Sequence, residues 1–272
     1  MNETLATAVA IAREAGALLL SYYDRGIRLE YKGEADIVTE ADRASEALIV
    51  KRLQAQFPEH AVLAEEGGGH RAESEYRWYV DPLDGTTNFA HGFPMFCVSM
   101  GLEKNGEMIL GAVYDPLRDE MFTAAKQAGA ELNGRPLRVS KVDRLEEALV
   151  GTGFPSNKRH KNANIHFYHQ ISLRTHGVRR AGSAALDLAY VAAGRLDCFW
   201  EFNLHPWDLA AGALLVREAG GQVSDMAGRP HRLDAESIAA TNGLLHGELQ
   251  EAFEEIFAGR YRAGLPPVRR PA

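Results

Sequence analysis

The sequence has little cysteine and no long uncharged apolar run. Cys97 and Cys198 are the only two cysteines in 272 residues, too few for a disulfide framework or a thiolate zinc site, and they suit a reducing compartment. No segment reaches the roughly 18 to 20 uncharged apolar residues that a membrane span requires. The first twenty residues lack a basic leader, and Arg13 and Glu14 interrupt their apolar stretch, so we expect no signal peptide. These absences predict a soluble cytoplasmic protein.

The charge balance is acidic. The chain carries 30 Lys plus Arg against 37 Asp plus Glu, a net charge of −7, which argues against nonspecific binding to nucleic acid. With 46% hydrophobic and 25% charged residues, the composition is typical of a folded globular protein. The length favours one large domain or two closely packed ones. We expect an enzyme, and the next step is to find where in the chain its excess of acidic residues lies.

The first part of the chain combines two helices with several strands. Apolar residues recur at helical spacing over 3–25. A second helix is predicted over 39–57, where Thr39 and Asp42 resemble a weak capping box. Helices followed by hairpin-linked strands indicate an α+β unit ending near residue 140. The expected strands are 61–64, 77–80, 96–102, 109–114 and 120–124, with turns at 104–107 and 132–137.

The second part of the chain alternates strands and helices, which favours an α/β half. No linker rich in Gly, Ser or Pro separates the two parts, so we expect them to pack together. We therefore divide the chain into an α+β half at 1–140, an α/β half at 141–259 and a flexible tail at 260–272, which has four Arg and no acid. The expected elements of the second half are strands at 148–152 and 196–202 and helices at 162–175, 184–193 and 208–219.

The most informative segment is WYVDPLDGTTNF at 78–89. A short strand ends at Val80, and Asp81 and Asp84 follow on one tight turn, so both carboxylates can reach a single point. Gly85 permits a close backbone approach, and the N–H groups after it could open a helix that binds an anion. This combination suits a hard cation such as Mg²⁺ shared with a substrate phosphate. Asp, Pro and Gly also dominate ordinary turns, so the segment alone supports both interpretations equally.

Further acidic residues stand in comparable positions. Glu65 and Glu66 end the apolar run at 61–64 and precede three glycines, although such a pair is also typical of a solvated turn. Asp208 stands where a helical apolar pattern begins, so it can be an N-cap and still offer an oxygen to a metal. Glu201 lies near the end of the segment DCFWEF at 197–202 and has an alternative interpretation as a polar residue of an edge strand. These acids alone would not identify an enzyme.

Four segments together resemble those of a known family. They are KGEADIVTEAD at 32–42, AEEGG at 64–68, DPLDGTTNF at 81–89 and WDLAAGALLVREAGG at 207–221. In these segments, their order and their separation, the chain resembles the inositol monophosphatase family of Mg²⁺-dependent, lithium-sensitive phosphatases. The segment EFNLHPWDLAAG at 201–212 is most similar to the bacterial enzymes. The resemblance implies a layered α-β-α-β-α sugar-phosphatase fold of two fused halves, with the metal site between them.

The resemblance implies a set of metal ligands. It assigns Glu65, Asp81 and the backbone carbonyl of Leu83 to a first Mg²⁺, and Asp81, Asp84 and Asp208 to a second, with a weaker third ion near Glu65. Ions bridged in this way lie about 3.5 to 4 Å apart. Two Mg²⁺ would cancel the four carboxylate charges, which would otherwise repel a phosphate dianion. The implied reaction is direct in-line attack of water on a phosphate monoester, without a phosphoenzyme.

The resemblance also assigns the water and substrate contacts. Thr86 and Glu65 would orient the attacking water and, with Asp84, carry the catalysis, while the N–H groups of Gly85 and Thr86 would hold phosphate oxygens. Lys32 and Asp42 are expected to be a surface lysine and a first-turn aspartate rather than catalytic groups. The residues expected at the polyol end of the substrate are Gly182, Ser183, Ala184 and Glu201, with Asp84 and Asp208 beside the ring.

We therefore expect hydrolysis of inositol monophosphate to inositol and phosphate. A site built to bind hydroxyl groups rejects analogues that lack them, which supports a polyol phosphate without selecting inositol. Fructose 1,6-bisphosphate, histidinol phosphate and phosphoadenosine phosphates, the substrates of relatives with the same motifs, remain alternatives. A non-catalytic binding role in a regulatory or nucleoprotein complex is an alternative of another class, motivated by the tail and by the family's usual dimers. We expect a homodimer that binds neither membrane nor nucleic acid.

Overall fold

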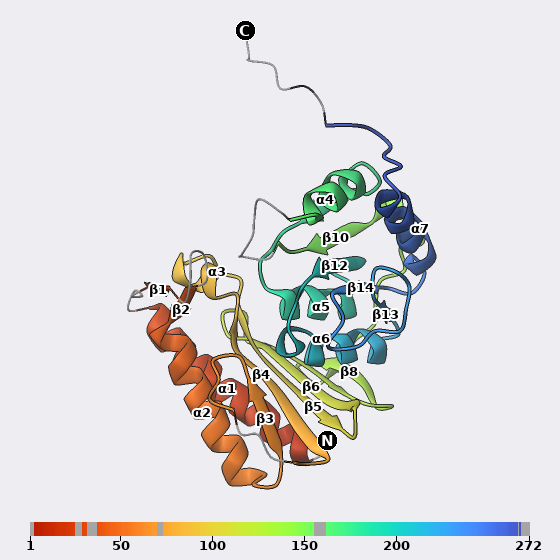
Figure 1. Ribbon diagram of the computed structural model, residues 1–272. Coiled ribbons are helices and arrows are strands. Elements are labelled where there is room, and N and C mark those ends of the chain that lie inside the picture. Colours follow the sequence, from red (N-terminus) through yellow and green to blue (C-terminus); the bar gives the residue numbers. More distant parts are fainter. Residues whose placement is uncertain are drawn as a thin grey trace.

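A seven-stranded sheet and two long helices form the first half of the chain (Figure 1). The structure, a computed structural model, describes residues 3–24, 29–31, 37–69, 73–154, 162–265 and 267. In chain order the elements are α1 (Glu3–Tyr23), β1 (Leu29–Tyr31), β2 (Ile37–Thr39), α2 (Glu40–Gln56), β3 (Ala61–Ala64), β4 (Tyr76–Asp84), α3 (Thr86–Ala90), β5 (Cys97–Lys104), β6 (Glu107–Asp115), β7 (Glu120–Ala125), β8 (Gly129–Leu132) and β9 (Arg135–Pro136). The sheet has the order β3-β4-β5-β6-β7-β8-β9, and its one parallel pair is β3 with β4. β1 and β2 form a ribbon of their own.

A five-stranded sheet forms the centre of the second half. Its elements are η1 (Leu145–Glu147), β10 (Leu149–Thr152), α4 (Asn164–Ser172), β11 (Gly177–Arg179), α5 (Ala184–Ala192), β12 (Cys198–Phe202), α6 (Pro206–Glu218), β13 (Gln222–Ser224), β14 (Ser237–Thr241) and α7 (His246–Phe257). The sheet has the order β11-β10-β12-β14-β13. β11, β10 and β12 are parallel, and β14 runs antiparallel to both of its neighbours.

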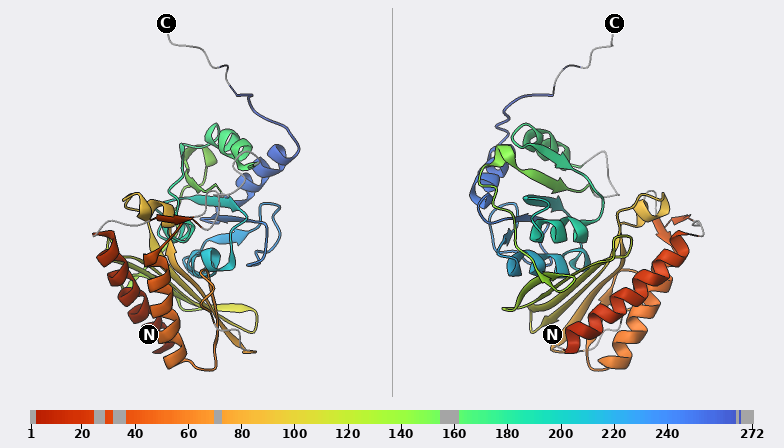
Figure 2. Two further views of the ribbon diagram at one scale, coloured as in Figure 1. Left: turned by 60° about the vertical axis from the view of Figure 1, so that its left-hand side comes forward. Right: turned by 180° about the vertical axis from the view of Figure 1, so that it is seen from behind.

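The helices and sheets stack in five layers (Figures 1 and 2). α1 and α2 pack side by side on one face of the seven-stranded sheet and bury one apolar cluster against it. α5 and α6 lie between the two sheets, in a second cluster that contains side chains from both halves. α4 and α7 cover the outer face of the five-stranded sheet over a third cluster. This arrangement confirms the predicted α-β-α-β-α architecture.

Two glycines let α6 approach the large sheet closely. Gly101 and Gly111 lie opposite one another on β5 and β6. A Cβ atom on Gly101 would lie 2.7 Å from the Cβ of Ala210, and one on Gly111 would lie 2.9 Å from the carbonyl oxygen of Ala211. Packed carbon atoms keep about 3.5 to 4.0 Å apart, so a larger residue at either position would lift α6. α6 also contacts β4, and Asp208 in the first turn of α6 lies close enough to Asp81 of β4 for its charge to act on it.

α1 is the one helix of the described residues that is long and apolar enough, by length and hydropathy, to cross a membrane. Its buried side chains, Leu5, Ile11 and Leu19 among them, belong to the cluster under α2 and the seven-stranded sheet. Arg13 and Glu14 lie on its exposed side. Packing in the core of the first half therefore accounts for the apolar composition of this helix.

Two predicted boundaries differ from the structure at functional positions. β4 continues through Asp84, although we placed the aspartates in a turn after a strand at 77–80. α6 begins at Pro206, because His205 is its N-cap and Asp208 its third residue. The Asp208 carboxylate accepts a hydrogen bond from the His205 N–H at 2.7 Å. The prediction of Asp208 as an N-cap is therefore wrong, although its carboxylate does satisfy an N–H group at the start of the helix.

The short strands and the end of the chain were predicted least completely. The sequence interpretation did not include the terminal helix α7 or the short strands β1, β2, β8, β9, β11, β13 and β14. The first residues of the predicted tail lie against α4, where the side-chain amide of Gln170 donates to the Ala263 carbonyl at 2.8 Å and accepts from the Arg262 N–H at 2.8 Å. Flexibility of the remaining tail stays a prediction.

Candidate active site

Glu65 and Asp81 are neighbours because they follow paired residues of two parallel strands. β3 pairs with β4 in parallel, and Ala64 lies opposite Val80. The chain leaves β3 at Glu65, whose N–H donates to the carbonyl of Val80 at 3.2 Å. Parallel strands carry the chain to the same edge of a sheet. This register therefore brings the Glu65 loop to the segment of β4 that holds Asp81.

A bulge in β4 directs Asp81 and Asp84 to one site. Across from β5 these residues pair with Ser99 and Cys97, and the register shifts between them. Residues three apart in a regular strand face opposite sides of the sheet, and a bulge re-aims one of them. Gly85 then turns the chain into α3 with a φ of 102°, a value that favours glycine.

The carboxylates at this edge raise one another's pKa values. Asp81 is 2% exposed. Burial raises its pKa well above the usual value, and the charges of Glu65, Asp84 and Asp208 raise it further. Burial and the charge of Asp84 raise the pKa of Asp208 to about 7, although hydrogen bonds with His205 and Asp81 oppose the shift. The site therefore concentrates negative charge in a desolvated place.

This donor set suits a hard divalent cation. Carboxylate oxygens are the ligands that Mg²⁺ prefers, and a bound cation would offset both the burial and the mutual repulsion that raise the pKa values of Asp81 and Asp208. Within the described part of the chain, no three His, Cys, Asp or Glu side chains already form a metal-ligand cluster. The fit to a cation therefore rests on the chemistry and the charge of the donors, Glu65, Asp81, Asp84 and Asp208.

Asp84 connects the two halves of the chain. Its Oδ2 atom accepts hydrogen bonds from the Ser183 hydroxyl at 2.7 Å and from the Ala185 N–H at 2.7 Å. These donors lie at the N-terminus of α5, where positive helix-end charge favours a carboxylate. Burial raises the pKa of Asp84, and these hydrogen bonds partly counteract that effect. The loop predicted to contact the polyol thus lies directly beside a predicted metal ligand.

Thr86 is held by a residue that sequence reasoning set aside. Its hydroxyl lies 2.9 Å from Oδ1 of Asp42 and 3.1 Å from the carbonyl oxygen of Leu83, and it can donate to either. Asp42 is completely buried and forms the capping box of α2 with Thr39. Burial raises the pKa of Asp42, while its hydrogen bonds from Thr39 and Thr86 lower it. Asp42 is therefore part of the candidate site through its contact with Thr86. The signal in the sequence was the capping box, which fixes the Asp42 side chain at the start of α2.

Glu201, a residue predicted to contact the substrate, lies close enough to the carboxylate cluster for its charges to act on it. It lies on β12 and is 7% exposed. A Cβ atom on Gly153 would lie 2.0 Å from Oε2 of Glu201, so a larger residue where the chain leaves β10 would displace the Glu201 carboxylate. Burial raises the pKa of Glu201 well above its usual value, and the charges of Asp187, Asp208 and Asp84 raise it further.

A comparison with protein families identifies the family of this chain. The family model described as the inositol monophosphatase family matches residues 1–258. The chain belongs to the inositol monophosphatase family. This assignment confirms the resemblance and supports a phosphatase. Members of the family act on small phosphate esters and are generally metal-dependent.

The relatives of this chain have two different names, Nus factor SuhB and inositol-1-monophosphatase. The chain is 48% identical to a protein named Nus factor SuhB from Pseudomonas aeruginosa, over 89% of this chain and 92% of that one. It is 45% identical to a Synechocystis protein named inositol-1-monophosphatase, over 91% of this chain and 87% of that one. A solved inositol monophosphatase from Anabaena superposes with a TM-score of 0.85 at 43% identity, covering 93% and 95% of the two chains.

The structure of this inositol monophosphatase family member also adds residues that we did not predict. Asp187 is a buried acid in the otherwise apolar helix α5, and its Oδ1 atom has no hydrogen-bond partner among the described residues. Burial and the charge of Asp84 raise its pKa well above the usual value. Its signal was visible in the segment RRAGSAALD, where one acid interrupts an apolar helix. The Asn88 side chain, which donates to the carbonyls of Ala181 and Gly182 at 2.9 and 3.2 Å, left no such signal.

Proposed function

We propose that the chain hydrolyses inositol monophosphate to inositol and phosphate in a Mg²⁺-dependent reaction. The observation that carries this proposal is the cluster of Glu65, Asp81, Asp84 and Asp208, in which burial and then the charges of neighbouring carboxylates raise the pKa values of Asp81 and Asp208. Membership of the inositol monophosphatase family supports it, as do relatives that are named inositol-1-monophosphatase.

In this proposal the cluster holds two Mg²⁺, with a third bound more weakly near Glu65. Glu65, Asp81 and the Leu83 carbonyl would hold the first ion, and Asp81, Asp84 and Asp208 the second. Bound there, Mg²⁺ would supply the positive charge that admits a phosphate dianion, activates water and stabilises the leaving alkoxide. Asp84 keeps its Oδ2 on the N-terminus of α5, so Oδ1 is its other potential ligand atom.

The chain's own residues would orient the water and the substrate. The hydroxyl of Thr86 can donate its single proton to Asp42 and then accept a hydrogen bond from the attacking water, with Glu65 as the second acceptor. The N–H groups of Gly85 and Thr86 would hold phosphate oxygens opposite the attack. The water would then displace the alcohol in line, without a phosphoenzyme.

The other end of the substrate would lie on the second half of the chain. The carboxylate of Glu201 would accept hydrogen bonds from polyol hydroxyls, beside the loop of Gly182, Ser183 and Ala184. Asp84 and Asp208 lie close enough to Glu201 for their charges to act on it, and a ring held by Glu201 would therefore also lie beside these two carboxylates. Substrates without hydroxyls at these positions would leave buried acceptors unpaired.

Phosphate release across a panel of monoesters tests this function. The panel contains inositol 1-phosphate, fructose 1,6-bisphosphate, histidinol phosphate and a phosphoadenosine phosphate, each with Mg²⁺ and with a chelator. We expect inositol 1-phosphate to give the highest kcat/KM and the chelator to abolish release. Faster release from another member of the panel would change the substrate but keep the chemistry. No release from any of them would contradict the enzymatic proposal.

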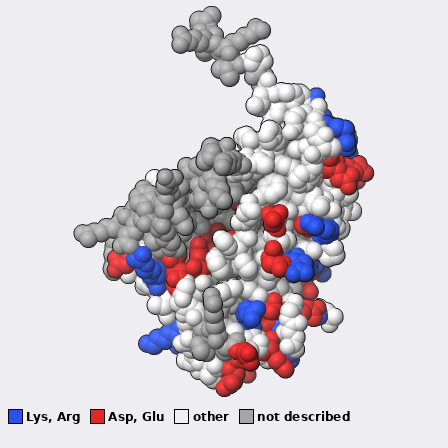
Figure 3. Space-filling view, in the orientation of Figure 1, with Lys and Arg blue, Asp and Glu red and all other residues white. Residues whose placement is uncertain are grey.

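A binding role in a regulatory or nucleoprotein complex is the second candidate, favoured by relatives named Nus factor SuhB. On the face in Figure 3, Lys and Arg are interspersed with Asp and Glu over the described surface, which favours a specific protein contact over nonspecific nucleic-acid binding. A deletion strain complemented with the wild type or with Asp84→Asn separates the two roles. Rescue by the inactive variant would establish a role without catalysis.

We also expect a cytoplasmic homodimer, and light scattering would measure its mass.

A further inference from the structure

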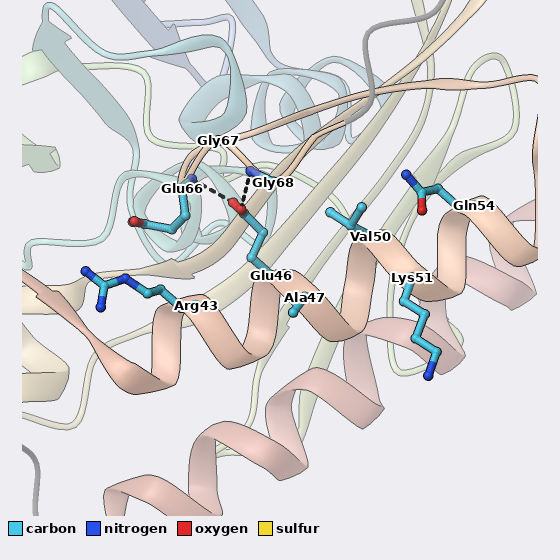
Figure 4. A pocket seen from close by; sticks show the side chains of 9 residues that line it. All are labelled: Arg43, Glu46, Ala47, Val50, Lys51, Gln54, Glu66, Gly67 and Gly68. Atoms are coloured by element: carbon cyan, nitrogen blue, oxygen red, sulfur yellow. Dashed lines mark hydrogen bonds between the residues drawn. The ribbon is translucent and has the colours of Figure 1, made fainter.

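The loop after β3, residues 65–69, is bound by the buried carboxylate of Glu46 on α2. Oε2 of Glu46 accepts a hydrogen bond from the N–H of Glu66 at 2.6 Å, and Oε1 accepts one from the N–H of Gly68 at 2.7 Å (Figure 4). Glu46 lies on α2 and is only 3% exposed. Hydrogen bonds from backbone amides to an ionised carboxylate are among the stronger ones in proteins. Both oxygens of one side chain thus fix two amides of the same loop.

The neighbouring amides of this loop are also satisfied. The N–H of Glu65 donates to the Val80 carbonyl on β4 at 3.2 Å, and the N–H of Gly67 donates to the Ala64 carbonyl at 3.3 Å. Four consecutive amides, from Glu65 to Gly68, therefore have acceptors, and Glu46 supplies two of the four. The two bonds to Glu46 are also the shorter ones.

An open pocket, rather than packed apolar side chains, borders the loop and α2 on this side. It has a volume of about 530 Å³ and is lined by Arg43, Glu46, Ala47, Val50, Lys51, Gln54 and residues 66–68 (Figure 4). Gly67 and Gly68 are exposed, and Gly67 has a φ of +85°. A glycine loop at the edge of a pocket has little packing to hold it. Its position therefore depends on its hydrogen bonds.

Glu46 shares one face of α2 with two other residues that contact the site. Asp42 accepts the hydrogen bond from Thr86, and the Ser45 hydroxyl donates to the carbonyl of Pro82 at 2.9 Å. Residues three and four apart lie on one face of a helix. All three side chains are polar and buried. The start of α2 thus contacts two of the three chain segments that carry the predicted metal ligands, the loop after β3 and the end of β4.

We propose that Glu46 is a positioning residue that holds Glu65 in place for metal binding. This inference rests on the proposed function, because Glu65 matters here as a metal ligand. Glu65 directly precedes Glu66, whose N–H is bound by Glu46, and its own N–H is bound by the Val80 carbonyl, so these bonds restrain the backbone from which the Glu65 carboxylate extends. Partners outside the ligand set that orient a ligand typically change metal affinity by 10- to 100-fold when they are removed.

The variant Glu46→Gln tests the proposal, since it keeps the side-chain shape and replaces one acceptor oxygen by a donor. We expect Mn²⁺, used as a spectroscopic probe, to bind 10- to 100-fold more weakly. We also expect the amides of Glu66 and Gly68 to exchange hydrogen at least about tenfold faster in the metal-free protein. Glu40→Gln, which removes an exposed charge from the same helix, should change neither quantity. Wild-type Mn²⁺ affinity and exchange in Glu46→Gln would overturn the proposal.

Gly68→Ala disturbs the same contact from the loop side. A Cβ atom on Gly68 would lie 2.6 Å from Oε1 of Glu46, and Gly68 is exposed, so the fold should survive. We expect the same loss of Mn²⁺ affinity, and in the double variant with Glu46→Gln the two losses should not add. Additive losses would mean that the two residues act independently and would refute the positioning role of Glu46.

Amide exchange is measured without metal or substrate. A wild type that releases no phosphate would therefore refute the proposed function, while the exchange result would still test whether Glu46 holds the loop.

Discussion

The hydroxyl of Thr86 lies 2.9 Å from the buried carboxylate of Asp42, to which it donates a hydrogen bond. The other oxygen of Asp42 accepts a hydrogen bond from the N–H of Thr39 at 2.8 Å. The capping box of α2 therefore fixes the orientation of the carboxylate that contacts Thr86. A hydroxyl has one proton. When this proton is donated in the hydrogen bond to Asp42, the lone pairs of the Thr86 oxygen remain free to accept a hydrogen bond from a water molecule. The position of that water would then depend on both residues.

Thr86→Ala should therefore lower kcat by roughly 100-fold and leave KM within a few-fold of the wild type, because misplacing a reactant affects the chemical step. Steady-state kinetics at saturating Mg²⁺ measure both constants. Thr86→Ser is the matched control, since it keeps the hydroxyl and should keep most of the activity. A Thr86→Ala variant with wild-type kcat would contradict the assignment of a water-orienting role.

Asp84→Asn should lower turnover by at least about 100-fold while the protein remains folded. The amide oxygen can still accept hydrogen bonds from Ser183 and Ala185, which hold Oδ2 in the native chain. The variant therefore removes charge from the cluster without removing the contact with α5. Phosphate release and circular dichroism, measured on the same preparation, test the two expectations. Turnover close to that of the wild type would refute the assignment of Asp84 to the second metal.

Asp208→Asn should stabilise the metal-free protein at neutral pH. The pKa of Asp208 is raised to about 7, above the ordinary value of about 3.9 expected in the unfolded chain. The folded state therefore binds more protons, and stability is lost as the pH rises from about 4 through 7. Urea unfolding in EDTA should show the variant gaining more than about 1 kcal/mol over the wild type at pH 8 and little at pH 4. An equal difference at both pH values would show that Asp208 does not titrate in this range.

Local patterns predicted the parts of the fold and site whose signals are local. The strand at Ala61–Ala64 is found where its apolar run predicted it. Asp81 and Asp84 are close in sequence as well as in space, so one segment was enough to propose them as a pair. α7 also has a helical apolar pattern in Leu249, Phe253 and Ile256, all buried, so its sequence does carry the signal of a helix.

Contacts to backbone atoms could not be predicted in the same way. Glu46 binds the amides of Glu66 and Gly68, and amides have no residue type that a pattern could detect. From the sequence, Glu46 is one acid among several on a helix whose partner loop lies 20 positions away. The register shift between Asp81 and Asp84 is equally invisible, because a bulge depends on the facing strand. The residues that position the site were therefore harder to predict than the residues that compose it.

His231 should make the protein less stable in mild acid. Burial and the charge of Arg217 lower its pKa to about 4, and neither ring nitrogen has a hydrogen-bond partner among the described residues. The unfolded chain takes up the proton near pH 6.5, so this contribution is present above that pH and is lost as the pH falls towards 4. Relative to His231→Leu, the wild type should lose about 2 kcal/mol between pH 7 and pH 5. Chemical unfolding at both pH values measures this, with the exposed His176→Leu as a control that should show no such change.

Arg195→Lys should weaken the contact between the two halves of the chain. The guanidinium of Arg195 donates two hydrogen bonds of 2.6 Å to the carboxylate of Glu120 on β7 and lies over the rings of Tyr190 and Phe122. Lysine cannot reproduce the paired bonds or the stacking of a planar group, so we expect a loss of about 1 kcal/mol in the free energy of unfolding. Arg232→Lys is the control, because Arg232 also pairs with a carboxylate through two nitrogens but within one exposed loop. Urea unfolding should show a clear loss for the first variant and almost none for the second, and equal losses would mean that the contact between the halves adds nothing to an ordinary surface pair.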